Sequence, residues 1–248
     1  MLLLLLLLVP LARAAPLELA SPATRATLVE LYTSEGCSSC PPADRWFSRL
    51  RDDPRLWREI VPVAFHVDYW NHLGWTDRFA SATHSRRQRS YVDAGQVSTV
   101  YTPGFVVAGQ EWRGWFQGRE PEFEPDREAG VLTLRIADGV VDARFVPRGA
   151  AAGAGRLELH VALLGFGLET AVQSGENAGR SLRHDFVVLD HARVPLEARE
   201  QGHSARFDWS PRVAPGGRRA VAAWVSPRDA PVPLQAVGGW WPGTMPGG

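Results

Sequence analysis

The first part of the chain alternates between apolar runs and a stretch with helical spacing. Residues 27–34 (TLVELYTS) are rich in β-branched and apolar side chains, which is typical of a strand. Pro41 and Pro42 suit the first turn of a helix, and the residues after them repeat large apolar side chains at helical spacing. Residues 59–70 (EIVPVAFHVDYW) form a nearly continuous apolar run, which predicts a strand buried on both faces.

A second helix and a third strand follow in the pattern. Residues 76–95 predict a helix that Thr76 or Asp77 caps and that Gly95 ends, and residues 104–108 (GFVVA) predict a strand. Strands and helices that alternate in this order predict an α/β layer arrangement with right-handed crossovers.

Beyond residue 130 the apolar pattern changes to the period of strands. Residues 131–147 predict two strands around Asp138-Gly139, a pair that signals a type I′ hairpin. Further strand-like runs follow between Gly- and Pro-rich turns, namely RLELHVALLG, HDFVVLD, ARFDWS and RRAVAAWVSP. This second part predicts a smaller all-β, sandwich-like domain.

These patterns predict where the domains begin and end. The α/β domain takes residues 25–117 and the β-rich domain takes residues 131–242. Residues 118–130 (GREPEFEPDREAG) are charged and contain two prolines, so they predict a linker.

The N-terminal residues MLLLLLLLVPLARA resemble a secretory signal peptide. Their apolar run is far too short to span a bilayer, and Ala12-Arg13-Ala14 fits a small-x-small cleavage site. We expect residues 1–14 to be a signal peptide, which would place the mature protein in the periplasm or outside a bacterial cell. A disordered leader or a misplaced start codon is the alternative. The later apolar runs are too short to predict a membrane span in the mature chain.

The composition indicates a globular protein with balanced charge. The chain has 45% hydrophobic and 22% charged residues, which is typical of a globular protein. Its 27 basic side chains balance its 27 acidic ones, so the net charge predicts no nucleic-acid partner.

The chain has two cysteines, Cys37 and Cys40, in the stretch GCSSCPP between the first strand and the first helix. The N-terminus of a helix stabilises a thiolate, so Cys37 suits the role of nucleophile. Cys40 would then resolve the mixed disulfide. A C-x-x-C pair near a βαβ pattern is typical of a thioredoxin-like redox motif. We therefore expect a thiol–disulfide oxidoreductase without a cofactor, whose partners are protein thiols or disulfides and a redox protein.

Other readings of the cysteine pair stay open. Structural zinc lacks a second pair of cysteines, and a purely structural disulfide would close a loop too short to stabilise much. A non-catalytic binding protein is the main rival, because two thiols and a nearby histidine could hold copper(I) or the scaffold could hold a protein partner. In a third reading the β-rich domain carries the function.

Thr102-Pro103 opens the third strand. The cis form of an X-Pro bond costs only about 0.5–1 kcal/mol. In a fold built around C-x-x-C this position would face the disulfide, so we expect the Thr102-Pro103 bond to be cis.

Four polar and aromatic residues, His66, Asp68, Tyr69 and Trp70, end the second predicted strand. In open α/β sheets this end of the strands lines the functional crevice. A histidine or an aspartate there could move protons or tune the thiolate, and a hydrogen-bonded structural cluster is the alternative. Residues 174–185 (SGENAGRSLRHD) in the second part predict a structured turn that contacts a partner, with anion binding as the alternative.

These stretches resemble the bacterial secreted proteins grouped as the domain of unknown function 1223. The resemblance rests on LVELYTSEGCSSCPPAD, VAFHVDYWNHLGW with TDRFAS, STVYTPGFVVAG and SGENAGRSLRHDFVV. It implies a thioredoxin-like fold, Cys37 and Cys40 as the redox pair and Pro103 as the cis-proline. It also implies that the four strand-end residues form a family motif beside them, and it supplies no reaction.

Overall fold

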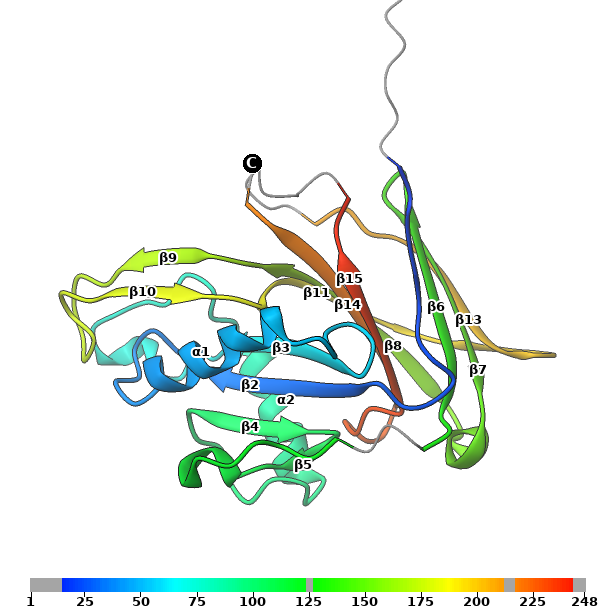
Figure 1. Cartoon of the computed structure of the whole chain (residues 1–248), viewed down its shortest axis with the longest axis horizontal. Helices are drawn as coiled ribbons and strands as arrows, with labels where there is room; N and C mark the ends of the chain where they lie inside the picture. Colours follow the sequence, from blue (N-terminus) through cyan, green and yellow to red (C-terminus); the bar gives the residue numbers. More distant parts are fainter. Residues whose placement is uncertain (1–14, 124–126, 212–216, 243–248) are drawn as a thin grey trace, which may run out of the picture.

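The computed structural model describes residues 15–123, 127–211 and 217–242, whose strands form three sheets next to two α-helices (Figure 1). The helices are α1 (Pro41–Ser48) and α2 (Ala82–Asp93). The predicted signal peptide, residues 1–14, lies outside the described residues.

An eight-stranded sheet in the order β15-β14-β8-β11-β3-β2-β4-β5 runs through the molecule. Its strands, in chain order, are β2 (Thr27–Thr33), β3 (Ile60–His66), β4 (Gly104–Val107), β5 (Gln110–Glu111), β8 (Leu157–Gly165), β11 (Val187–Pro195), β14 (Arg219–Pro227) and β15 (Gln235–Trp240).

Two smaller sheets complete the fold. A five-stranded sheet in the order β1-β6-β7-β13-β12 is built from β1 (Leu17–Ala20), β6 (Gly130–Ala137), β7 (Val140–Pro147), β12 (Glu197–Arg199) and β13 (Gly202–Asp208). A hairpin of β9 (Leu168–Ala171) and β10 (Ser181–His184) forms the third sheet. Short 3₁₀ turns are η1 (Arg49–Asp52), η2 (Asn71–Leu73), η3 (Gly114–Gln117) and η4 (Gly149–Gly153).

The two parts of the chain meet where β11 pairs with β3. The strands β2 and β3 lie parallel, with α1 between them in the chain, and β4 lies antiparallel to β2. The strand β11 then adds to the other edge of β3, where Val187 pairs with Ala64 and the Ala64 N–H donates to the Phe186 carbonyl at 2.9 Å. Strands from the second half of the chain therefore continue the sheet begun by the first.

The predicted fold class, an α/β thioredoxin-like domain followed by a smaller all-β domain, is wrong. The described residues are mostly β-sheet, and the large sheet takes strands from both parts of the chain. Every position of β8 is buried, as is every position of β14 between its ends. A strand in a two-sheet sandwich has one covered face, so such complete burial requires a layer on each side. The nearly unbroken apolar run LELHVALLG carried this signal.

Alternate side chains of β8 and β14 belong to two different cores. Leu159 and Val161 pack into a cluster with side chains of the five-stranded sheet. Leu164 and Trp224 pack into a second cluster, which also holds side chains of β2, β3 and both helices. The large sheet thus separates a sandwich core from the core that supports α1 and α2.

Some local predictions hold and others do not. Asp138 and Gly139 have φ values of 52° and 75° and join β6 to β7, which confirms the hairpin. The second helix is shorter than predicted, because it begins at Ala82, where the Ser81 hydroxyl caps it by accepting from the Thr83 N–H. Asp77 instead accepts from the Phe79 N–H before the helix.

Segments of the first and second parts also pair with each other near the predicted linker. Residue 24 forms a bridge with residue 128, and β1 pairs with β6. Residues 124–126 lie outside the described part of the chain. The predicted domain boundaries stay predictions, because strand pairing does not decide which segments fold independently. In the described residues, the helices are all too short or too polar to cross a bilayer.

A buried ion pair ties α2 to the centre of the sheet. The Arg87 guanidinium donates to both carboxylate oxygens of Glu30, at 2.7 and 2.9 Å, and both side chains are buried. Tyr32 and Tyr91 donate their hydroxyls to the same carboxylate. The guanidinium also lies 4.9 Å from the ring centroid of Trp224 on β14, so it contacts both parts of the chain.

Replacement of Arg87 by methionine should strongly destabilise the fold. It would leave the Glu30 carboxylate buried without its counter-charge, which costs about 3–5 kcal/mol in comparable sites. Urea denaturation would measure the loss in the free energy of unfolding. Arg89→Met, an exposed position of the same helix, is the matched control and should cost about 0.5 kcal/mol or less. Equal effects of the two substitutions would show that the pair does not tie the helix to the sheet.

Candidate functional site

The two cysteines form a disulfide at the start of α1. Their Cα atoms lie 5.4 Å apart, and both residues are fully buried. The Cys37 N–H donates to the Ser34 carbonyl and the Cys40 N–H to the Cys37 carbonyl, so a tight turn leads into the helix. Cys40 is the N-cap residue, and Pro41 and Pro42 take the first helical positions, as predicted.

Trp70 joins this turn to the loop before β4. The Thr102–Pro103 bond is cis, and the Trp70 indole N–H donates to the Thr102 hydroxyl at 2.8 Å. The other side of Trp70 packs against Gly36, where an added Cβ would lie 3.0 Å from the Trp70 Cβ. The turn before Cys37 and the cis-proline loop are therefore held by one side chain.

Two other residues of the predicted motif are bound to α2. The Ser85 hydroxyl donates to the Asp68 carboxylate at 2.5 Å, and the Tyr69 hydroxyl donates to Gln88 at 3.1 Å. Gln88 in turn donates to the Tyr101 carbonyl at 2.7 Å, next to the cis-proline. Burial raises the pKa of Tyr69 to about 12, so its hydroxyl stays protonated. These contacts position α2 against the loop of Thr102 and Pro103.

His66 belongs to a group of buried titratable side chains that includes the residues on either side of the cysteine pair, Glu35 and Asp44, and we call this group the acid–base cluster. Its members come from the end of β3, from the segments that follow β2 and β3, from α1 and from the end of β10. They are Glu35, Asp44, His66, Asp77 and His184.

Contacts within the acid–base cluster run through His184. Its Nε2 lies 3.6 Å from Glu35 Oε1, and its Nδ1 lies 3.7 Å from Asp44 Oδ2. Its ring centroid lies 4.8 Å from that of His66, and His66 Nδ1 donates to Asp77 Oδ2 at 2.6 Å. Asp77 Oδ2 also accepts the Glu35 N–H at 2.9 Å. One residue of the second part thus lies between two carboxylates that flank the cysteine pair in sequence.

Polar atoms without a hydrogen-bond partner gather in the acid–base cluster. They include both ring nitrogens of His184, Nε2 of His66, Oε1 of Glu35 and Oδ2 of Asp44. Most buried polar atoms in proteins are hydrogen-bonded, so such a concentration suggests a site that handles protons or holds water.

The two carboxyl groups beside His184 differ in acidity. Burial raises the pKa of Asp44, although the nearby His184 and His66 partly offset this. Burial also opposes ionisation of Glu35, but His184 and the indole N–H of Trp75 outweigh it and lower the pKa of Glu35. Pairs of carboxyl groups whose pKa values are pushed apart are typical of acid–base sites. Here Glu35 holds charge and Asp44 is the group suited to carry a proton.

His66 and Asp77 form a buried ion pair. Burial alone would lower the pKa of His66, but Asp77 outweighs it and raises that pKa. Burial would raise the pKa of Asp77, but His66 and two backbone N–H groups lower it to about 2. The pair fixes the turn that carries Glu35.

Residues 172–180, the tip of the β9–β10 hairpin, lie against the cysteine turn, and we call them the capping loop. The Asn177 side chain donates to the carbonyls of Glu35 and Cys37, at 2.8 and 3.0 Å. The Glu176 carboxylate accepts the Ser38 N–H at 2.9 Å. Of the segment 174–185 predicted as a structured turn, residues 174–180 form a turn and residues 181–184 form β10, and the turn contacts the cysteines of its own chain.

Sequence reasoning missed much of the acid–base cluster. Asp44 had a local signal, because it lies four residues after Cys40 among the apolar positions of α1. Asp77 lies within TDRFAS, where the sequence pattern instead predicts that Thr76 or Asp77 caps a helix. His184 and Asn177 lie within residues 174–185, which are predicted to contact a partner, but their place beside the cysteines depends on where β11 pairs. Among the described residues, no three side chains of His, Cys, Asp and Glu are arranged to hold a metal ion.

A buried disulfide, a cis-proline loop and an acid–base cluster on a mostly β scaffold make up the candidate functional site. The family model DUF1223, described as a protein of unknown function, matches residues 28–226. The chain belongs to this family.

Two solved structures share the fold. Protein AGR_C_4864 from Agrobacterium tumefaciens is 22% identical with a TM-score of 0.62, and the match covers 92% of this chain and 100% of that one. HBP35 of Porphyromonas gingivalis is 12% identical with a TM-score of 0.53, and the match covers 91% of this chain and 78% of that one. No curated protein matches the chain.

Substitution of Asp77 by asparagine should cost stability in a limited range of pH. The pKa of Asp77 is lower in the folded chain than in the unfolded chain, so the ionised carboxylate stabilises the fold at pH values above the unfolded pKa of about 3.9. This stabilisation is lost as the pH falls towards about 2. The pKa of His66 is higher in the folded chain, so the protonated imidazole stabilises the fold at pH values below the unfolded pKa of about 6.5. This stabilisation is lost as the pH rises through the folded pKa of His66.

The difference in unfolding free energy between the wild type and Asp77→Asn should therefore be largest between about pH 4 and 6.5. Urea denaturation at a series of pH values would measure it. Asp93→Asn, at the exposed end of α2, is the control and should give a small difference that varies little. A difference for Asp77→Asn that does not change with pH would contradict a charged pair.

Proposed function

We propose that this chain is an exported thiol–disulfide oxidoreductase in which Cys37 is the nucleophile and Cys40 the resolving thiol. The observation that carries the proposal is the disulfide at the start of α1, held against the cis-proline loop by Trp70. The positive end of the dipole of α1 lies next to Cys37 and would stabilise its thiolate, which gives Cys37 its reactivity.

The exchange transfers two electrons between the cysteine pair and a protein partner. In the reduced chain the Cys37 thiolate attacks one sulfur of the partner disulfide, which breaks that bond and forms a mixed disulfide while a partner thiolate leaves. Cys40 then loses its proton and attacks the Cys37 sulfur. This forms the Cys37–Cys40 disulfide and releases the second partner thiolate, so the partner is reduced and the chain oxidised. The same steps in reverse oxidise a partner dithiol.

Asp44 is suited to accept the proton of Cys40. The Asp44 N–H donates to the Cys40 carbonyl at 3.0 Å, so Cys40 already has the helical geometry of α1. Side chains four residues apart on a helix lie on one face, with Cβ atoms about 5–6 Å apart. The raised pKa of Asp44 suits a group that takes up and returns a proton. His184 lies next to Asp44 and positions it.

Export and partners follow from the same reasoning. The expected signal peptide would place the cysteine pair where disulfides persist. Outside the cytosol the partners would be protein thiols or disulfides and a redox protein that resets the pair.

Substitution of Cys40 by serine should trap a mixed disulfide on Cys37. Without the resolving thiol, the first step has no intramolecular exit. The adduct with a disulfide-bonded model substrate would be measured by mass spectrometry, and alkylation of Cys37 against pH should give a pKa below about 8.5. Cys37→Ser is the control and should form no adduct. An unperturbed Cys37 pKa together with no adduct from Cys40→Ser would overturn the proposal.

Substitution of Asp44 by asparagine should slow the resolving step. Loss of a positioned base typically costs a factor of about 100 or more. Single-turnover release of the partner from the mixed disulfide would measure the rate. The rate for the wild type should change with pH as Asp44 titrates, and the rate for Asp44→Asn should lose this dependence. Asp52→Asn, at an exposed position after α1, is the control with an unchanged rate. A wild-type rate in Asp44→Asn would remove Asp44 from the mechanism.

A further inference from the structure

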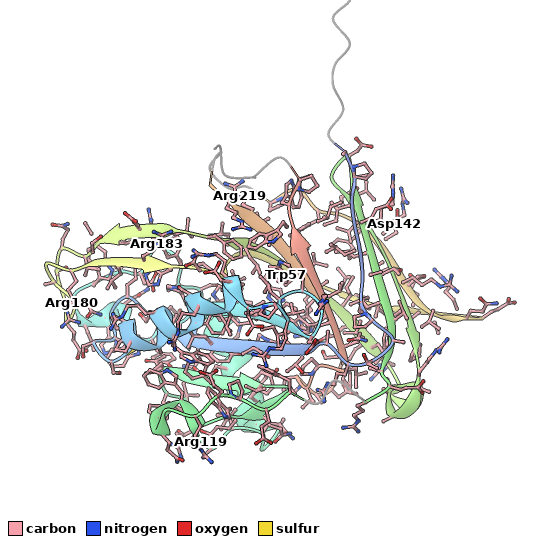
Figure 2. The ribbon with its side chains drawn as sticks, in the orientation of Figure 1. Trp57, Arg119, Asp142, Arg180, Arg183 and Arg219 are labelled. Atoms are coloured by element: carbon pink, nitrogen blue, oxygen red, sulfur yellow. A yellow bond between two sulfur atoms is a disulfide. The ribbon has the colours of Figure 1, made fainter. Side chains whose placement is uncertain are left out.

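The capping loop comes from a part of the chain distant in sequence from the cysteines. It joins β9 to β10, and α1 packs against β10 along the same side of the molecule (Figure 1). Figure 2 shows Arg180 at the tip of this hairpin, at the end of the molecule where α1 begins. Through this loop, the second part of the chain can therefore affect the cysteine pair.

Asn177 fixes the position of the capping loop. Its side chain is fully buried, and its amide nitrogen donates to two carbonyls, one before Cys37 and one of Cys37 itself. Its amide oxygen accepts from the Arg180 guanidinium at 2.9 Å. Because all these groups are paired, the loop has one preferred position on the cysteine turn.

Glu176 is placed by this anchor next to Cys37. Its carboxylate accepts the N–H of Ser38, the residue that follows Cys37. The hydrogen bond from Ser38 lowers the pKa of Glu176, so the carboxylate is charged at neutral pH. The N-cap residue Cys40 makes no side-chain hydrogen bond of its own to the helix. A carboxylate from the second part thus occupies a backbone donor next to the nucleophile.

A charged Glu176 acts against a thiolate at Cys37. The N–H groups before and at the start of a helix are the donors that stabilise such a thiolate, and the Ser38 N–H is already occupied. A second negative charge close by also raises the free energy of the thiolate, while it leaves a neutral disulfide unaffected. Both effects favour the oxidised form.

We propose that Glu176 is a positioning residue that tunes the redox pair, because its carboxylate holds the Ser38 N–H and opposes a thiolate at Cys37. The inference rests on the proposed exchange at Cys37. It adds that the second part of the chain sets how readily the cysteine pair is reduced.

Substitution of Glu176 by glutamine tests the charge alone, because the amide oxygen of glutamine can still accept the Ser38 N–H. The pKa of Cys37 in the reduced protein, measured from alkylation against pH, should fall by about half a pH unit, which is about a threefold change in the thiolate fraction. Above that pKa the equilibrium with dithiothreitol should shift towards the dithiol by a similar factor. At a pH well below the pKa of Cys37, where the thiol is protonated, the substitution should leave the equilibrium with dithiothreitol unchanged. Glu176→Lys should extend each change in the same direction.

Glu169→Gln and Glu169→Lys are the matched controls, because Glu169 is an exposed carboxylate on β9 of the same hairpin. They should leave the Cys37 pKa unchanged. A Cys37 pKa that is equal in the wild type and both Glu176 variants would overturn the role of Glu176. If Cys40→Ser still forms its mixed disulfide in that case, the proposed function stands and the inference alone fails.

Discussion

The pairing of β11 with β3 is the contact on which the site depends. It joins the strands of the second part to the edge of β3 at Ala64, two residues before His66. Because β10 ends at His184 and β11 begins three residues later, this pairing also brings the β9–β10 hairpin to the carboxyl end of β3. His184 then lies between Glu35 and Asp44, and Asn177 reaches the turn of Cys37. The acid–base cluster and the capping loop are both consequences of one strand pairing.

Burial gives the carboxyl groups of this site different tasks. Water is excluded from Glu35 and Asp44 alike, yet Glu35 has a close imidazole and an indole donor while Asp44 has weaker compensation. Glu35 therefore keeps its negative charge, and Asp44 keeps its proton more readily. Under the proposed function, this arrangement would let thiols gain and lose protons inside a closed site that excludes water.

Local features of the site could be predicted from the sequence, and its assembly could not. The strand before Cys37 and the proline-started helix after Cys40 follow from nearby residues. The cis bond at Pro103 follows from the place of Thr102-Pro103 relative to the distant C-x-x-C pair. The strand pairing does not, because a period of two shows which side chains share a face but not which strand lies beside them. The strand β15 was missed for a different reason. Gly238 and Gly239 suggest a turn, yet they are small because Trp57 and Leu19 lie directly against them.

The distance along the chain between Cys37 and its cover has a consequence for biosynthesis. Asn177 follows Cys37 by 140 residues, so an emerging chain carries both thiols long before the loop that encloses them exists. Contacts over such separations form late, after the loop-closure entropy of the intervening chain has been overcome. Oxidants therefore meet an open cysteine pair on the nascent chain and an enclosed one on the finished protein. The redox state of a newly made molecule is then set partly by the order in which it is oxidised and folded.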